Sequence, residues 1–121
     1  MARPPWFPPD PTLVGEEPDY RFSLANERTF LAWIRTALAL TAGGLAAISL
    51  LPDLFGSEAL GLILLTLAFA TAGTAYRRWA LNETAMRLSE PLPSSRLPLV
   101  VAIATSMVAI VGASLFVLDA L

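Results

Sequence analysis

Three arginines recur at seven-residue intervals where the first apolar part of the chain begins. They are Arg21, Arg28 and Arg35. Seven residues advance an α-helix by about 700°, so successive arginines differ by about 20° and form one basic stripe. A guanidinium group presents a planar fork of donors that matches two oxygens of a phosphate or carboxylate. The stripe is therefore a candidate anion-binding site. The same helix face continues into four small residues, Ala39, Ala42, Gly43 and Ala46.

Two interpretations of this stripe are open. In the first, Arg28 and Arg35 extend to lipid headgroups and only set the topology, while the small residues let helices pack closely. In the second, the stripe faces other helices and lines an anion-binding vestibule. The second is favoured because the apolar run after Arg35 is slightly short for a bilayer, and ionisable groups at that depth usually face protein or water.

Two polar residues lie within the stripe region. Glu27 could pair with Arg77, Arg78 or Arg96, or could act as a gate that competes with an incoming anion for these arginines. Asn26 could join helices through hydrogen bonds or contact the ligand directly.

The composition excludes most catalytic chemistry. The chain has no His, no Cys and no Lys, so serine or threonine nucleophiles would have no base to activate them, and thiol and zinc chemistry are absent. The acids of the first 19 residues lack the spacing of a metal-binding loop, and no phosphate-binding glycine loop occurs. We expect neither enzyme activity, nor a catalytic residue, a metal site or a cofactor.

Three charge-free stretches must position the polar groups. They contain 17 residues between Arg35 and Asp53, 18 between Glu58 and Arg77, and 22 between Arg96 and Asp119. As helices they would measure roughly 26, 27 and 33 Å, against about 30 Å for the hydrocarbon core of a bilayer. The sequence predicts an all-α integral membrane protein with three transmembrane helices. The expected spans are about 24–51, about 58–78 with a cytoplasmic helical extension to 89, and about 96–118.

Helix ends are predicted from local signals. Ser23 is a candidate N-cap of the first span, and Pro52 closes that span. Glu83 and Arg87 are expected to form an i,i+4 ion pair on the extension. Pro91 and Pro93 end that extension, and Ser94 or Ser95 is expected to cap the third span.

All eight arginines fall on one side of this layout, and the other side holds acids alone. The positive-inside rule places the N-terminus in the cytoplasm and the C-terminus outside. The formal net charge of −2 hides this asymmetry. From Tyr20 onward, the cytoplasmic side carries seven arginines against three glutamates.

Two domains are expected: a flexible, Pro-rich cytoplasmic arm at 1–19 and a three-span domain at 20–121. Six prolines before residue 19 exclude the apolar core of a signal peptide. The arm is either a disordered tail or an extended segment whose Trp6 and Phe7 rest at the lipid interface or on a neighbour.

The run LANERTFLAWIRT at Leu24–Thr36 resembles the signature of the YidH-like small membrane proteins, the domain of unknown function 202. The three-span layout is also similar to the small membrane subunit of the vacuolar transporter chaperone complex, which makes and translocates polyphosphate. That resemblance implies a pentamer around a channel with a basic mouth. It places Arg21, Arg28 and Arg96 on basic positions of the mouth, Glu27 on an acidic one, and Arg77 or Arg78 near another.

These inferences give two functional hypotheses. The first is a homo-oligomer in a bacterial inner (plasma) membrane whose vestibule binds phosphate-rich anions such as polyphosphate, with conduction of these anions left open as a further step. Its expected anion ligands are Arg21, Arg28, Arg35, Arg78 and Arg96, with Glu27 and Asn26 as gating or ion-pair residues. The alternative is a scaffold that anchors a protein partner through the arm and the extension. A weaker possibility is a site for anionic lipid headgroups. Membrane lipid is an expected partner, and nucleic acid is not.

Overall fold

The computed structural model describes residues 4 and 6–121, which form one short 3-10 turn and three long helices. The 3-10 turn η1 covers Pro11–Leu13, α1 covers Tyr20–Leu50, α2 covers Ser57–Arg87, and α3 covers Leu97–Ala120. All three helices are long and apolar enough to cross a membrane. The predicted all-α, three-span fold class is therefore confirmed, and no strand occurs in the described part of the chain.

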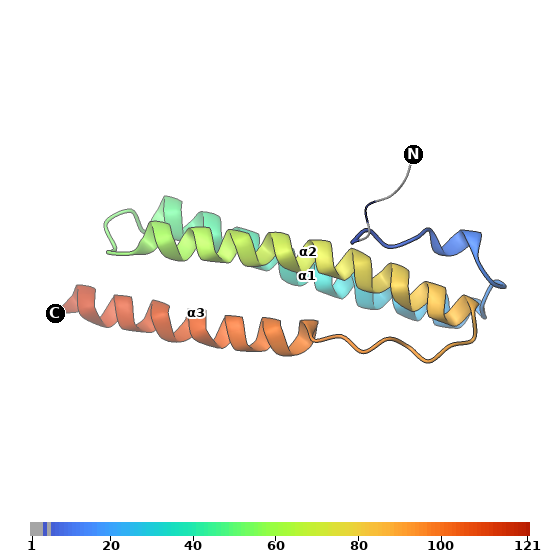
Figure 1. Cartoon of the computed structure of the whole chain (residues 1–121). Helices are drawn as coiled ribbons and strands as arrows, with labels where there is room; N and C mark the ends of the chain where they lie inside the picture. The colour runs from blue at the N-terminus through green and yellow to red at the C-terminus, as the bar shows by residue number, and fades with distance from the viewer. Residues whose placement is uncertain (1–3, 5) are drawn as a thin grey trace.

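Helices α1 and α2 run side by side in opposite directions and hold most of the buried residues (Figure 1). The helices approach closely at Gly44 and Gly61. A Cβ atom added at Gly44 would lie 2.9 Å from the carbonyl oxygen of Gly61, and one added at Gly61 would lie 2.8 Å from that of Gly44. Small residues thus let the two backbones meet, as in other membrane helix pairs.

Small residues of α2 and the predicted small-residue face of α1 differ in burial. Ala68 and Ala75 of α2 are buried within the chain against α1. Ala39 and Gly43 stay exposed, because the face of α1 that meets α2 is instead formed by Asn26, Ala37, Gly44 and Ala47.

Helix α1 begins one turn earlier than predicted. Asp19, not Ser23, is its N-cap, and its carboxylate accepts the backbone N–H of Arg21 at 2.9 Å. Ser23 lies inside the helix and donates its hydroxyl to Glu83 at 2.6 Å. The prediction of Ser23 as the cap was wrong because the helix starts before the apolar run, where the Asp19 carboxylate supplies the cap.

Helix α2 ends at Arg87, and Ser89 turns the chain with a left-handed φ of 55°. The linker 88–96 then runs back along α2 (Figure 1). Helix α3 therefore starts beside residues 74–81 of α2 rather than beyond the end of that helix. The hydroxyl of Ser95 accepts the N–H of Leu97 at 3.2 Å, which confirms one of the two predicted caps. Among the described residues, α3 packs on α2 and not on α1.

The segment before α1 contacts the far end of α2. Arg87 donates its Nε–H to the carbonyl of Val14 at 2.8 Å, and the N–H of Glu16 returns a bond to the carbonyl of Arg87 at 3.0 Å. The ring of Phe7 lies 6.0 Å from that of Tyr76. Residues 1–3 and 5 of the predicted arm lie outside the described residues, and the flexibility of the arm stays a prediction.

Candidate functional site

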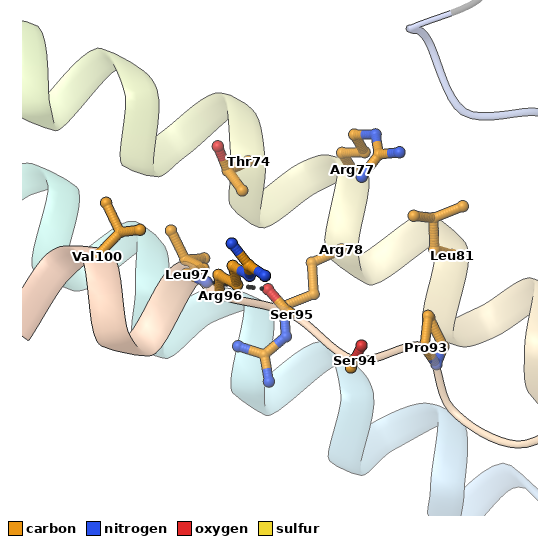
Figure 2. A pocket seen from close by; sticks show the side chains of 10 residues that line it. All are labelled: Thr74, Arg77, Arg78, Leu81, Pro93, Ser94, Ser95, Arg96, Leu97 and Val100. Carbon is orange, nitrogen blue, oxygen red and sulfur yellow. Dashed lines mark hydrogen bonds between the residues drawn. The ribbon is translucent and has the colours of Figure 1, made fainter.

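Three arginines line a cavity where α2, the linker and the start of α3 come together (Figure 2). We call this cavity the arginine pocket; its volume is about 330 Å³. Arg77, Arg78 and Arg96 supply its charge. The remaining lining residues are Thr74, Leu81, Pro93, Ser94, Ser95, Leu97 and Val100.

The local sequence explains why the pocket forms. Pro91 and Pro93 cannot continue the helix, so the chain leaves α2 and stays extended up to Ser95. Pro98 fits the first turn of α3, where a missing N–H costs nothing. Arg96 immediately precedes this turn, and the returning linker therefore brings it to the side of α2 that carries Arg78.

Figure 2 shows the side chains of Arg78 and Arg96 on either side of Ser95, whereas Arg77 leaves α2 in another direction. The guanidinium carbon of Arg78 lies 5.8 Å from the ring centre of Trp33 on α1. A cation over an indole face is attracted to it, which orients the arginine without using its donors.

No acidic residue lines the arginine pocket. Its polar wall combines guanidinium forks with the hydroxyl groups of Ser94, Ser95 and Thr74. Its other wall is apolar and includes Leu97 and Val100. Forked cationic donors with neighbouring hydroxyl groups suit an anion with several oxygens, above all a phosphate.

The structure divides the five predicted anion ligands into two groups. Arg78 and Arg96 lie together in the arginine pocket, with Arg77 as an additional member. Arg21, Arg28 and Arg35 lie on the exposed side of α1, away from α2. Within one chain, the stripe and the pocket are separate surfaces.

Arg21 already has a partner within its own turn. Its guanidinium lies 2.8 Å from the carboxylate of Asp19. This hydrogen-bonded guanidinium, and next the backbone N–H of Arg21, hold the pKa of the Asp19 carboxyl below its ordinary value. Among the three arginines of the stripe, Arg21 is thus the one whose charge is partly neutralised by an ion pair within its own chain.

Asn26 joins the helices, as one of the two interpretations expected. The residue is 8% exposed, and its side-chain amide donates to the Trp79 carbonyl at 3.0 Å and to the Glu83 carboxylate at 3.1 Å. Asn82 adds a longer bond of 3.4 Å to the Asn26 side-chain oxygen. These bonds use up the Asn26 donor group inside the helix pair.

Glu27 forms none of the predicted ion pairs with Arg77, Arg78 or Arg96, all of which lie in the described part of the chain. It is exposed because it lies about 100° around α1 from Asn26, the residue that faces α2. There it borders a second cavity beside Phe30 and Trp79.

Glu83 and Arg87 were expected to pair with each other, and this expectation was wrong. Glu83 accepts hydrogen bonds from Ser23 and Asn26 on α1, whereas Arg87 holds the Val14 carbonyl. The sequence analysis missed Glu83 as an interhelical residue. Ser23, Asn26, Phe30 and Trp33 recur at spacings of three and four, and this pattern could have marked the face of α1 that meets α2.

Comparisons with known proteins place the chain in a family. Residues 21–85 match the domain of unknown function DUF202. The inner membrane protein YidH of Escherichia coli (strain K12) is 48% identical over 101 residues, which cover 81% of this chain and 88% of YidH. An uncharacterized protein of Mycobacterium tuberculosis (strain H37Rv), Rv2272, is 43% identical over 113 residues, covering 91% of this chain and 93% of that protein.

No solved structure shows a significant match. The predicted location, an integral protein of a bacterial inner membrane, agrees with the three membrane-spanning helices and with the name of YidH. The family pattern covers more than half of the chain and includes Asn26, Arg28, Arg78 and Glu83. The chain belongs to the DUF202 family of membrane proteins.

Proposed function

We propose that this protein is an oligomeric membrane protein that binds phosphate-rich anions at its arginine-bearing end, which the charge distribution predicts to be cytoplasmic. The observation that carries this proposal is the arginine pocket. It places Arg77, Arg78 and Arg96 around one cavity with no acidic residue in its lining.

The chemistry of the lining favours phosphate over a simple halide. Arginine forks bind pairs of oxygens, and Ser94 and Ser95 add hydroxyl donors beside them. A chloride ion has a single centre and cannot offer each donor of a fork its own acceptor atom. A polyanion such as polyphosphate could extend from the pocket to further arginines.

The exposed stripe of α1 offers those further arginines if several chains assemble. Arg28 and Arg35 are exposed on a face that α2 does not cover, and small residues continue that face. Close packing of such faces between copies would gather the stripes at one end of the assembly. The resemblance to the membrane subunit of the vacuolar transporter chaperone implies five copies and a polyphosphate path, and conduction is the part of the proposal that needs such an assembly.

The first experiment measures thermal unfolding of the purified protein with polyphosphate, inorganic phosphate and chloride at equal ionic strength. A ligand at about 100 times its Kd stabilises the folded protein by about 2.7 kcal/mol. We expect polyphosphate to raise the Tm most and chloride not at all. Arg78→Gln and Arg96→Gln should each reduce the polyphosphate shift, and Arg96→Lys should restore part of it by keeping the charge without the fork.

Arg28→Gln is the matched variant, because it removes the same charge outside the pocket. If the shift depends on Arg28 and not on Arg78 or Arg96, the site is the stripe and the pocket assignment is wrong. A wild-type protein that gives no shift with polyphosphate would refute the proposed function altogether.

A further inference from the structure

An apolar groove lies between α2 and α3, farther from the linker than the arginine pocket. We call it the α2–α3 groove; its volume is about 500 Å³, and its walls include Leu67 and Ala70 of α2 and Ala104 and Met107 of α3. Its one polar lining residue is Thr66, whose hydroxyl is already bonded to the Leu62 carbonyl at 2.8 Å. The groove therefore offers no free donor to a polar ligand.

The groove continues the arginine pocket along the same two helices. Thr74 of the pocket lies one turn from Ala70 of the groove on α2, and Val100 lies one turn from Ala104 on α3. In Figure 2, Thr74 and Val100 are at the end of the pocket that is farther from Pro93, where the groove begins. The two cavities therefore follow one another along α2 and α3, one helical turn apart, with the basic cavity at the linker end; we call the two together the channel.

The other end of the groove is narrowed by contacts between α3 and the start of α2. A Cβ atom added at Gly56 would lie 3.1 Å from the Leu115 side chain, and one added at Gly112 would lie 3.9 Å from Leu60. From Leu60 to Ala70 the groove follows α2 for about 15 Å. One leaflet of a bilayer has a hydrocarbon depth of about 15 Å. The apolar part of the channel thus matches a chain that reaches from one membrane surface to the midplane.

We propose that an anionic phospholipid occupies this channel, with its phosphate in the arginine pocket and one acyl chain in the α2–α3 groove. The inference rests on the phosphate recognition that the proposed function assigns to the same arginines. A single ligand fits both the arginine pocket and the α2–α3 groove only if it is anionic at one end and apolar over the depth of a leaflet. A helix from a second copy would fill the groove but would leave the guanidinium groups of Arg78 and Arg96 without an anion.

The occupant also explains the light packing of α3. Among the described residues α3 rests on α2 alone, and few of its side chains are buried. An acyl chain between the helices would fill the space that their side chains leave. The lipid would then belong to the leaflet at the arginine-bearing end.

The test uses the full chain, purified in mild detergent and mixed with phosphatidylglycerol or with phosphatidylcholine of the same acyl chains. Native mass spectrometry counts the lipid that stays bound. We expect retention of phosphatidylglycerol in preference to phosphatidylcholine. Ala104→Phe should fill the groove and reduce the retained phosphatidylglycerol by about tenfold, while the polyphosphate shift in Tm persists. The double change Arg78→Gln with Arg96→Gln should reduce both.

Ala102→Phe is the matched control, because Ala102 is exposed on α3 outside the groove lining. It should leave lipid retention and the polyphosphate shift unchanged. Ala104→Leu serves if Ala104→Phe does not fold. Equal retention of both lipids, or full retention of phosphatidylglycerol by the folded Ala104 variants, would overturn the inference and leave the proposed function standing. Loss of the oligomer in Ala104→Phe without loss of lipid would assign the groove to a second copy.

The failure of the proposed function has a different signature. In that case the double arginine variant would keep the full polyphosphate shift, whatever the Ala104 variants do to lipid retention.

Discussion

The side-chain amide of Asn26 donates a hydrogen bond to the main-chain carbonyl of Trp79, 3.0 Å away, and so ties α1 to α2 near the arginine-bearing end. The same amide reaches Glu83 at 3.1 Å. A buried asparagine in a membrane helix is thus fully used by the neighbouring helix rather than by a ligand. This relationship makes the helix pair, and not the single helix, the unit that positions Arg78.

Replacing Asn26 should loosen the helix pair. We expect Asn26→Leu to lower the free energy of unfolding by about 0.6–1.7 kcal/mol, from the average to the maximum measured for single hydrogen bonds between membrane helices. Unfolding by a denaturing detergent in mixed micelles measures the loss. Thr36→Val is a suitable control, because the Thr36 hydroxyl bonds only to the Ala32 carbonyl within α1. Equal stability of Asn26→Leu and the wild type would contradict this role.

Two adjacent glycines of α1 should respond differently to a methyl group. Gly44→Ala would place Cβ 2.9 Å from the Gly61 carbonyl oxygen and 2.9 Å from Leu65, whereas Gly43→Ala would meet only Leu64 at 3.8 Å. Overpacking of this kind costs about 1–3 kcal/mol. The same unfolding measurement should show a clear loss for Gly44→Ala and none for Gly43→Ala. A loss of similar size for both would mean that the contact at Gly44 is not specific.

The cap at Asp19 should make the first turn of α1 sensitive to pH. The pKa of the Asp19 carboxyl is lowered by Arg21, so the cap stabilises the helix fully above the unfolded value of about 3.9 and is lost as the pH falls through the folded value. The quantity to measure is the rate of amide hydrogen exchange in the first turn, divided by the rate in Asp19→Asn at the same pH. This ratio should be constant between pH 7 and 5 and should rise at lower pH. Asparagine keeps the acceptor but does not titrate, and identical profiles for the two proteins would refute the effect.

Gly15 should be essential for the contact between the N-terminal segment and α2. Its φ of +59° favours glycine, and an added Cβ would overlap the Arg87 carbonyl. We therefore expect Gly15→Ala to release the segment, which limited proteolysis within residues 6–19 would detect as faster cleavage. Gly73→Ala is the control, since nothing lies within 4 Å of its added Cβ. Resistance of Gly15→Ala to cleavage, at the wild-type level, would count against this contact.

The spans were predictable because the bilayer imposes long charge-free helices, and the three stretches in the sequence correspond to α1, α2 and α3. The start of α1 was not, since its first turn lies outside the apolar run and depends on a single carboxylate at Asp19. Propensity and spacing describe neighbours on one helix. Glu83 found its partners on another helix, at sequence separations of 57 and 60 residues.

The arginine pocket was only half visible in the sequence for a similar reason. Arg78 and Arg96 were both candidate ligands, but their meeting depends on the return of the linker 88–96 along α2. No local signal in Pro91 or Pro93 specifies that return path. The regular spacing of Arg21, Arg28 and Arg35 was easier to detect, yet it describes a surface that lies apart from the pocket within one chain.

The separate position of α3 has a consequence for how the protein is made. Helices α1 and α2 bury Asn26, Thr71 and the Gly44–Gly61 contact against each other, so they gain by leaving the translocon as a pair. Helix α3 is the most apolar of the three and carries no charge before Asp119. Helix α3 can enter the lipid alone, after the linker has been synthesised, and then dock onto α2. We therefore expect biogenesis to proceed in two stages, with the arginine pocket formed only at the second.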